Sequence, residues 1–121
     1  MTLVAVDSPG IYNIDLIQGA SFVRSLTWTD QNNTLIDLTG YTAKLDIRQN
    51  ISDTSPIISL STSNSRITLG GALGTILLNL NATETGSLNF STALYDLELY
   101  SGSNTIRLLQ GKVILSKQVT V

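Results

Sequence analysis

The sequence predicts a single all-β domain, and three observations carry that prediction. Ser, Thr and Asn supply most of the polar side chains, while charged residues occupy only 13% of the 121 positions; Thr suits a pleated, half-buried surface, whereas the helix formers Lys and Glu are scarce. Short alternations of apolar and polar residues follow one another with almost no helical periodicity. Gly, Asn, Asp and Ser separate these alternations every 8 to 12 residues or so, a spacing typical of a β-sandwich or barrel.

The first expected strands follow a loose leader over residues 1–10. Residues 11–17, IYNIDLI, alternate until QGA ends the strand. In residues 21–28, SFVRSLTW, one face carries Phe22, Leu26 and Trp28. Arg24 is the exception on that face. We expect Arg24 near a sheet edge or an interface, where its stem can cover apolar surface while the guanidinium reaches out.

The most regular strand is expected over residues 41–48, YTAKLDIR, after the turns TDQNNT and DLTG. One face of this strand is apolar, and a slip of one residue would expose all of it, so the alternation fixes the register. The outer face remains for contacts with other molecules. Together with Arg24, we expect its side chains to form an interaction surface: Thr42, Lys44, Asp46 and Arg48.

The second half of the chain continues the pattern. The loop NISDTSP leads to IISLS, and the glycines of GGALG permit the positive φ angles of a hairpin. Residues 81–93 contain one capped helical turn that crosses from sheet to sheet. Tyr95 begins the next strand, LYDLELY, where a tyrosine corner is expected, and SGSN turns the chain into TIRLLQGKVILS. The expected core comprises Trp28, Tyr41, Leu45, Ile47, Leu78, Leu80, Leu97 and Leu99.

Composition argues against several kinds of site. The chain has no Cys and no His, which excludes disulfides, thiolate metal sites and the commonest general base. DQNNTLID lacks the Gly and Glu of a calcium loop, and GGALG is followed by a strand pattern rather than by Lys and a helix. Asp96 and Glu98 lie on an outward face near Asp46, which favours a salt-bridge ladder over acid/base catalysis. We therefore expect no enzyme, no catalytic residue, no cofactor and no metal.

Charge and hydropathy limit the partners. The nine acidic and seven basic residues are spread singly, without the Lys/Arg run that would neutralise phosphates, so nucleic acid is not an expected partner. No segment reaches the roughly 20 apolar residues that span a bilayer, and MTLVAVDSPG lacks the features of a signal peptide. We expect the chain to fold in a cytoplasm, with no membrane partner and no small-molecule ligand.

Five segments carry a resemblance to a known family: IQGASF, LTWTDQNNTLIDLTGYTAKLDIR, ITLGGALGTILLNLNATETGSL, YDLELY and RLLQGKVILSKQVT. In their order they resemble small bacteriophage virion domains similar to the N-terminal domain of the phage baseplate upper protein. The resemblance runs from about residue 17 to residue 120, but DQNNT stands where the family commonly has a Gly. The positions that match are Gly19, Trp28, Asp37, Leu38, Gly40, Arg48, Tyr95, Asp96, Gly111 and Val119.

The resemblance implies an immunoglobulin-like antiparallel β-sandwich of seven to nine strands over residues 11–121. It implies a virion structural protein of the tail or baseplate that mounts or connects a fibre or receptor-binding protein. Its partners would be other phage structural proteins and copies of itself in a symmetric assembly. A capsid decoration or cement protein is an alternative of the same class. A carbohydrate-binding module is an alternative of another class, and its free aromatic residues would be Tyr12, Tyr100 and Phe90.

Overall fold

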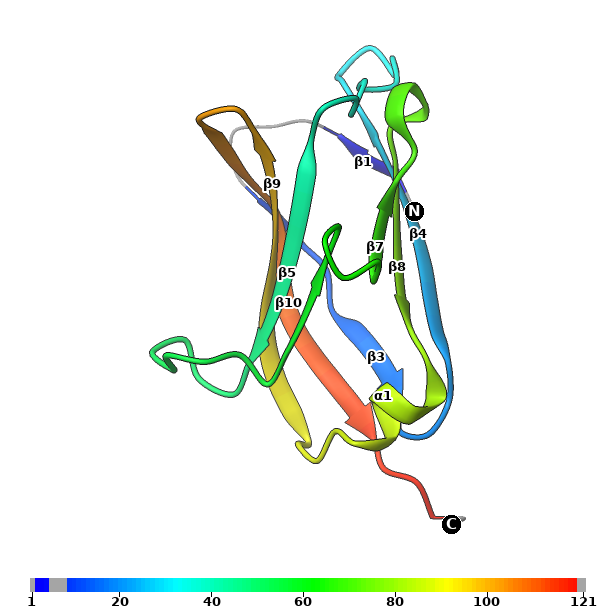
Figure 1. The fold of residues 1–121 in the computed structure, drawn as a ribbon, viewed down its shortest axis with the longest axis vertical. Coiled ribbons are helices and arrows are strands. Elements are labelled where there is room, and N and C mark those ends of the chain that lie inside the picture. The colour runs from blue at the N-terminus through cyan, green and yellow to red at the C-terminus, as the bar shows by residue number, and fades with distance from the viewer. Residues whose placement is uncertain (1, 5–8, 120–121) are drawn as a thin grey trace.

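The protein is an all-β sandwich of two sheets, as Figure 1 shows. The computed structural model describes residues 2–4 and 9–119. In Figure 1 the larger sheet lies at the left and the smaller sheet at the right, with a short helix at the lower end. Among the described residues, no helix is long and apolar enough to cross a membrane.

From edge to edge, the smaller sheet consists of β1 (Thr2–Val4), β4 (Phe22–Thr29), β8 (Thr75–Leu80) and β7 (Ile67–Leu69). The hairpin predicted around GGALG is confirmed, since β7 and β8 are antiparallel and flank the 3-10 turn η1 (Gly71–Leu73). Gly74 follows the turn with a φ of +67°. A Cβ on Gly74 would lie 2.7 Å from the carbonyl oxygen of Trp28, so this position requires glycine for both reasons.

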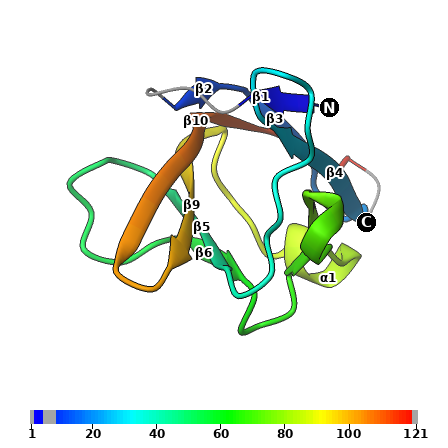
Figure 2. The ribbon, with the colours of Figure 1, turned by 90° about the horizontal axis from the view of Figure 1, so that it is seen from above.

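In order across the sheet, the larger sheet consists of β2 (Gly10–Ile11), β10 (Asn104–Ser116), β9 (Thr92–Ser101), β5 (Thr42–Arg48) and β6 (Ile58–Ser61). A further strand, β3 (Ile14–Ile17), pairs with the end of β10. Seen from above in Figure 2, β5, β6 and β9 lie apart from β4. The SGSN turn joins β9 to β10 as predicted, with Gly102 at a φ of +58°.

The N-terminal strands depart from two expectations. β1 pairs with β4, and β2 and β3 pair with β10, all in parallel, so the prediction of a wholly antiparallel sandwich is wrong for these three strands. β1 and β2 belong to different sheets, and such a crossing lets strands run parallel. The predicted loose leader is also wrong at Thr2–Val4, because these residues form β1 and Leu3 is buried in the core. Residues 1 and 5–8 of that leader lie outside the described residues.

The core lies between the sheets and follows the predicted alternation. Seven of the eight predicted core residues are buried, and the eighth, Tyr41, is half-buried and packs edge-on against Trp28 with ring centroids 6.4 Å apart. Phe90 was expected to be free but is buried in this core, which corrects that assignment. Phe90 stands just before β9, in the segment by which the chain crosses between the sheets, and its side chain packs into the core.

The crossing between the sheets is the predicted helical turn, α1 (Ala82–Gly86), which connects β8 to β9. Asn81 caps it by accepting a hydrogen bond from the Glu84 N–H at 2.8 Å, and the Glu84 carboxylate accepts one in return from the Asn81 N–H at 2.8 Å. This reciprocal pair is a capping box. Below it, the buried Thr85 hydroxyl accepts from the Gly19 N–H and donates to the Ala20 carbonyl, which fixes the QGA turn against α1.

The free edge of β6 is covered by side chains of the segment that follows it. Asn64 accepts a hydrogen bond from the Ser61 N–H at 2.9 Å and donates one to the Ser59 carbonyl at 2.9 Å. Arg66 donates a second hydrogen bond to that same carbonyl, also at 2.9 Å. An uncovered edge strand would present these groups to another chain. Pairing through this edge is therefore blocked.

Candidate interaction surface

The outer face of β5 lies where the sequence predicted it. Ala43, Leu45 and Ile47 are buried, so the four intervening side chains point away from the core. Thr42 and Lys44 are exposed, and Asp46 and Arg48 are half-buried. Four of the five predicted interaction residues are therefore on one surface.

Asp46 is the centre of a polar network on this face. The carboxylate of Asp46 accepts hydrogen bonds from the Ser59 hydroxyl at 2.6 Å and from the Arg48 guanidinium at 3.0 Å. Lys44 lies 3.9 Å from the same carboxylate. Arg48 also donates to the backbone carbonyl of Asp53 at 2.6 Å, which ties the loop after β5 to the strand.

A second ion pair lies on the neighbouring strands. Asp46 of β5 is the register partner of Asp96 of β9, and the carboxylate of Asp96 lies 3.4 Å from the Arg107 guanidinium of β10. The two carboxylates therefore face each other across β5 and β9, and each is offset by its own guanidinium: Asp46 pairs with Arg48 of the same strand, and Asp96 pairs with Arg107 of β10. The part of the chain that the structure describes contains no cluster of acidic residues that would hold a metal ion.

Tyr100 lies on the same outer face, at the far end of β9. Partial burial is the largest cause that raises the pKa of its hydroxyl, and the carboxylates of Glu98, Asp46 and Asp96 raise it further. The hydroxyl therefore remains neutral and can donate or accept a hydrogen bond over the physiological pH range.

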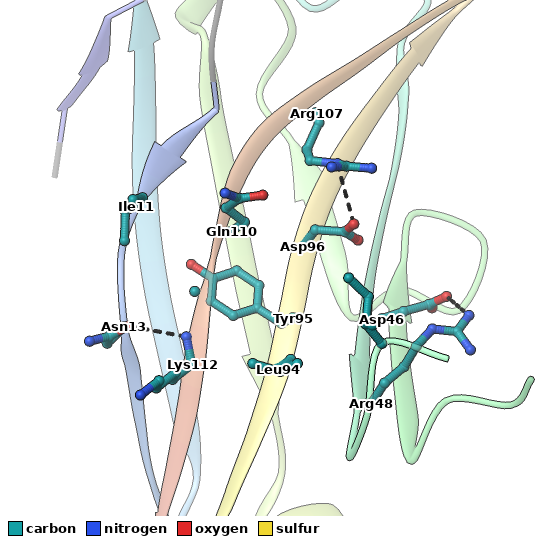
Figure 3. Close-up of a pocket in the computed structure, with 12 residues that line it drawn as sticks. Ile11, Asn13, Asp46, Arg48, Leu94, Tyr95, Asp96, Arg107, Gln110 and Lys112 are labelled. Atoms are coloured by element: carbon teal, nitrogen blue, oxygen red, sulfur yellow. Dashed lines mark hydrogen bonds and ion pairs between the residues drawn. The ribbon is translucent and has the colours of Figure 1, made fainter. Parts of the chain in front are cut away.

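A groove of about 560 Å³ crosses this outer face. Figure 3 shows the Asp46–Arg48 pair, the Asp96–Arg107 pair and Ile11 around it. Strands β2, β10, β9 and β5 form its floor, and the loop after β5 adds Ile51 to its lining. In both Figure 1 and Figure 2 that loop projects away from the sandwich beside the larger sheet.

The groove combines charged side chains with unusually exposed apolar ones. Ile11 of β2 is 79% exposed, Ile51 of the loop after β5 is 88% exposed, and Leu94 of β9 is 38% exposed. A single exposed apolar side chain needs no explanation, but several around one concave surface indicate a contact site. Lys112 adds a cation to the groove lining.

Tyr95 and Gly111 also line the groove. They are register partners on β9 and β10, and the Tyr95 hydroxyl donates a hydrogen bond of 2.5 Å to the backbone carbonyl of Tyr12. Burial raises the pKa of the Tyr95 hydroxyl, which keeps it protonated as a donor. The hydroxyl therefore bonds back to the backbone as the predicted tyrosine corner requires, and its acceptor lies in the distant segment between β2 and β3.

Arg24 does not join the other predicted site residues. It lies on the inward parity of β4, between Phe22 and Leu26, and its guanidinium donates a hydrogen bond to the Tyr12 hydroxyl. Arg24 therefore bridges the smaller sheet to the segment between β2 and β3. The guanidinium was expected to reach outward, but it lies over the rings of Tyr12 and Phe22.

Sequence reasoning missed part of the groove. The possible approach of Asp46 to Asp96 was anticipated, but Ile11, Ile51 and Arg107 were not. The first two lie in a two-residue strand and in a loop, where no alternation marks a face. Arg107 stands beside an irregularity in the register of β10 with β9, so its neighbours could not be counted from the sequence.

No protein-family model matches this chain, and no curated protein matches its sequence.

Proposed function

We propose that the protein is a bacteriophage virion structural protein, a tail or baseplate component that mounts or connects a fibre or receptor-binding protein. One structural observation supports an assembly role: the groove on the larger sheet joins strongly exposed apolar side chains to ion-paired charges. That mixture is typical of protein–protein contact surfaces. The phage setting rests on the resemblance of the sequence segments between residues 17 and 120.

We also infer an immunoglobulin-like arrangement of the strands. The order β4-β8-β7 corresponds to strands B, E and D, and the order β10-β9-β5-β6 corresponds to G, F, C and C′. β3, parallel to β10, would be the first strand of such a domain. Support for this assignment comes from the crossing at α1, which leads from strand E to strand F. The assignment uses eight strands and leaves β1 and β2 as short additions.

The aromatic side chains favour this proposal over a carbohydrate-binding module. All seven lie within the described residues, and each is buried or half-buried. A sugar-stacking platform needs an exposed ring face. Tyr12 packs against Arg24 instead, and Phe90 is in the core.

Localisation of the protein in virions tests the proposal. Electron cryomicroscopy of particles that carry a tagged copy should show extra density at the tail tip or fibre root. Density over the capsid would replace the tail assignment with the cement alternative. Absence of the protein from particles would refute both virion assignments.

A paired substitution tests the groove itself. Ile51→Asp should reduce incorporation into particles without lowering the melting temperature, because the side chain is 88% exposed. Leu73→Asp is the matched control, since Leu73 is an exposed apolar residue of η1 outside the groove. Equal incorporation of the two variants would exclude the groove as the contact surface.

A further inference from the structure

Arg24 occupies an aromatic cradle between the two sheets. Its guanidinium carbon lies 5.8 Å from the ring centroid of Tyr12 and 5.6 Å from that of Phe22. Both distances fall within the range of a cation–π contact. The guanidinium also donates a hydrogen bond to the Tyr12 hydroxyl. Three contacts therefore fix the orientation of one half-buried cation.

The Tyr12 side of the cradle is itself held in place. The Tyr12 N–H donates to the Gln110 carbonyl at 3.0 Å, and the Tyr12 carbonyl accepts from the Tyr95 hydroxyl at 2.5 Å. Gly111 permits this close approach, because a Cβ there would stand 2.4 Å from the Tyr12 carbonyl oxygen. The backbone of Tyr12 is thus held in place before any ligand arrives.

Arg24 differs from the other three arginines because it has no ion-pair partner among the described residues. Arg48, Arg66 and Arg107 each form an ion pair, whereas no carboxylate of residues 2–4 or 9–119 pairs with Arg24. A guanidinium has five N–H donors, and the described structure assigns Arg24 one acceptor, the Tyr12 hydroxyl.

The position of Arg24 would suit an apolar residue better if only stability mattered. Its neighbours on the same parity of β4 are Phe22 and Leu26, both buried. A half-buried cation with no counter-charge among residues 2–4 and 9–119 costs desolvation free energy that a leucine would avoid. Departures of this kind from the local pattern are expected at functional positions.

We propose that Arg24 is a binding site for a carboxylate, supplied by an acidic side chain or the C-terminus of a neighbouring protein chain. The planar fork of the guanidinium can donate two parallel hydrogen bonds to the two oxygens of a carboxylate. The aromatic cradle fixes the plane of that fork. Only the source of the carboxylate depends on the proposed structural role; the site itself does not.

The test uses the isolated full chain labelled with ¹⁵N, with sodium acetate as the probe at constant ionic strength. Acetate should shift the Arg24 Nε–Hε resonance and the Tyr12 amide resonance with saturation. Arg107, already paired with Asp96, is the internal control and should not show that shift. In Arg24→Gln, acetate should bind at least about tenfold more weakly, as judged from the Tyr12 amide. Arg107→Gln should retain the wild-type response.

Two further measurements separate binding from a structural role. Arg24→Leu should melt at the wild-type temperature or higher, whereas a marked fall would mean that Arg24 serves the fold and would overturn the proposal. Sodium chloride at the same ionic strength should leave both resonances unshifted, and an equal shift with chloride would overturn the carboxylate assignment. A linear, non-saturating response to acetate would do the same. Particle incorporation of Arg24→Gln then tests the source of the carboxylate separately.

Discussion

Replacement of Gly111 by alanine tests how the N-terminal segment is held against the larger sheet. An alanine Cβ at this position would lie 2.4 Å from the carbonyl oxygen and 2.9 Å from the carbonyl carbon of Tyr12. Both are backbone atoms, so no side-chain rotation relieves the clash. The chain between β2 and β3 must move away from β10, and the hydrogen bonds that hold Tyr12 are lost with it.

The magnitude follows from those contacts. Overpacking costs about 1–3 kcal/mol. The Tyr12–Gln110 and Tyr95–Tyr12 hydrogen bonds add about 1 kcal/mol each. We therefore expect Gly111→Ala to lower the free energy of unfolding by about 3–5 kcal/mol, which corresponds to a melting temperature lower by about 12–20 °C for a domain of this size.

Gly40→Ala is the matched control. Gly40 has a φ of +83° but no heavy atom within 4 Å of a built Cβ, so its cost is backbone strain alone, about 1–2 kcal/mol. Urea unfolding followed by fluorescence of the single, buried Trp28 measures both variants. If Gly111→Ala loses no more stability than Gly40→Ala, the steric argument is refuted. Tyr95→Phe should add little in the Gly111→Ala background, because its hydrogen bond is already broken.

Three other predictions concern β9, the capping box and the edge of β6. Leu97→Ala should lower the free energy of unfolding by about 2–5 kcal/mol, because Leu97 is fully buried. Leu94→Ala, on the outer face of the same strand, is the control, and in the same urea assay it should lower the free energy of unfolding by well under half as much. The hydrogen bond from the Asn81 N–H is the largest cause that lowers the pKa of Glu84 from its ordinary value of 4.5. The ionised Glu84 carboxylate therefore contributes its full stabilisation above pH 4.5, and this stabilisation is lost as the pH falls through the lowered pKa. The stability difference between wild type and Glu84→Gln should therefore shrink between pH 6 and pH 3 in thermal unfolding, and a constant difference would contradict this reasoning. Asn64→Ala should expose backbone groups of β6 and produce concentration-dependent self-association in light scattering; a monomer at all concentrations would show that the remaining cover is sufficient.

The sequence predicted the elements whose local pattern is strong. The alternation of residues 41–48 predicted β5 together with its buried and outer faces. When alternate side chains are apolar and the sheet has one core, only one register buries all of them. GGALG specified its hairpin, and residues 81–93 specified the helical turn. In each case the information lies within a few consecutive residues.

The candidate surface required information that no local pattern contains. Ile11 and Ile51 contribute to one groove only because β10, β9 and β5 lie in that order. Arg24 was recognised as a misfit in the alternation of β4, but its aromatic partner Tyr12 lies far away in the sequence of elements, between β2 and β3 beside the larger sheet. Parallel pairing of β1, β2 and β3 was missed because it depends on where the chain changes sheet.

The parallel pairing of β3 with β10 has a mechanical consequence. β3 is among the first strands and β10 is the last described strand, and Ile14 to Ile17 align in parallel with Val113 to Ser116. Tension applied to the chain before β3 and after β10 pulls these two strands along their length in opposite directions. All of their shared hydrogen bonds then bear the load together, whereas an antiparallel pair pulled from one end would open bond by bond. The domain is thus built to resist stretching between its two ends.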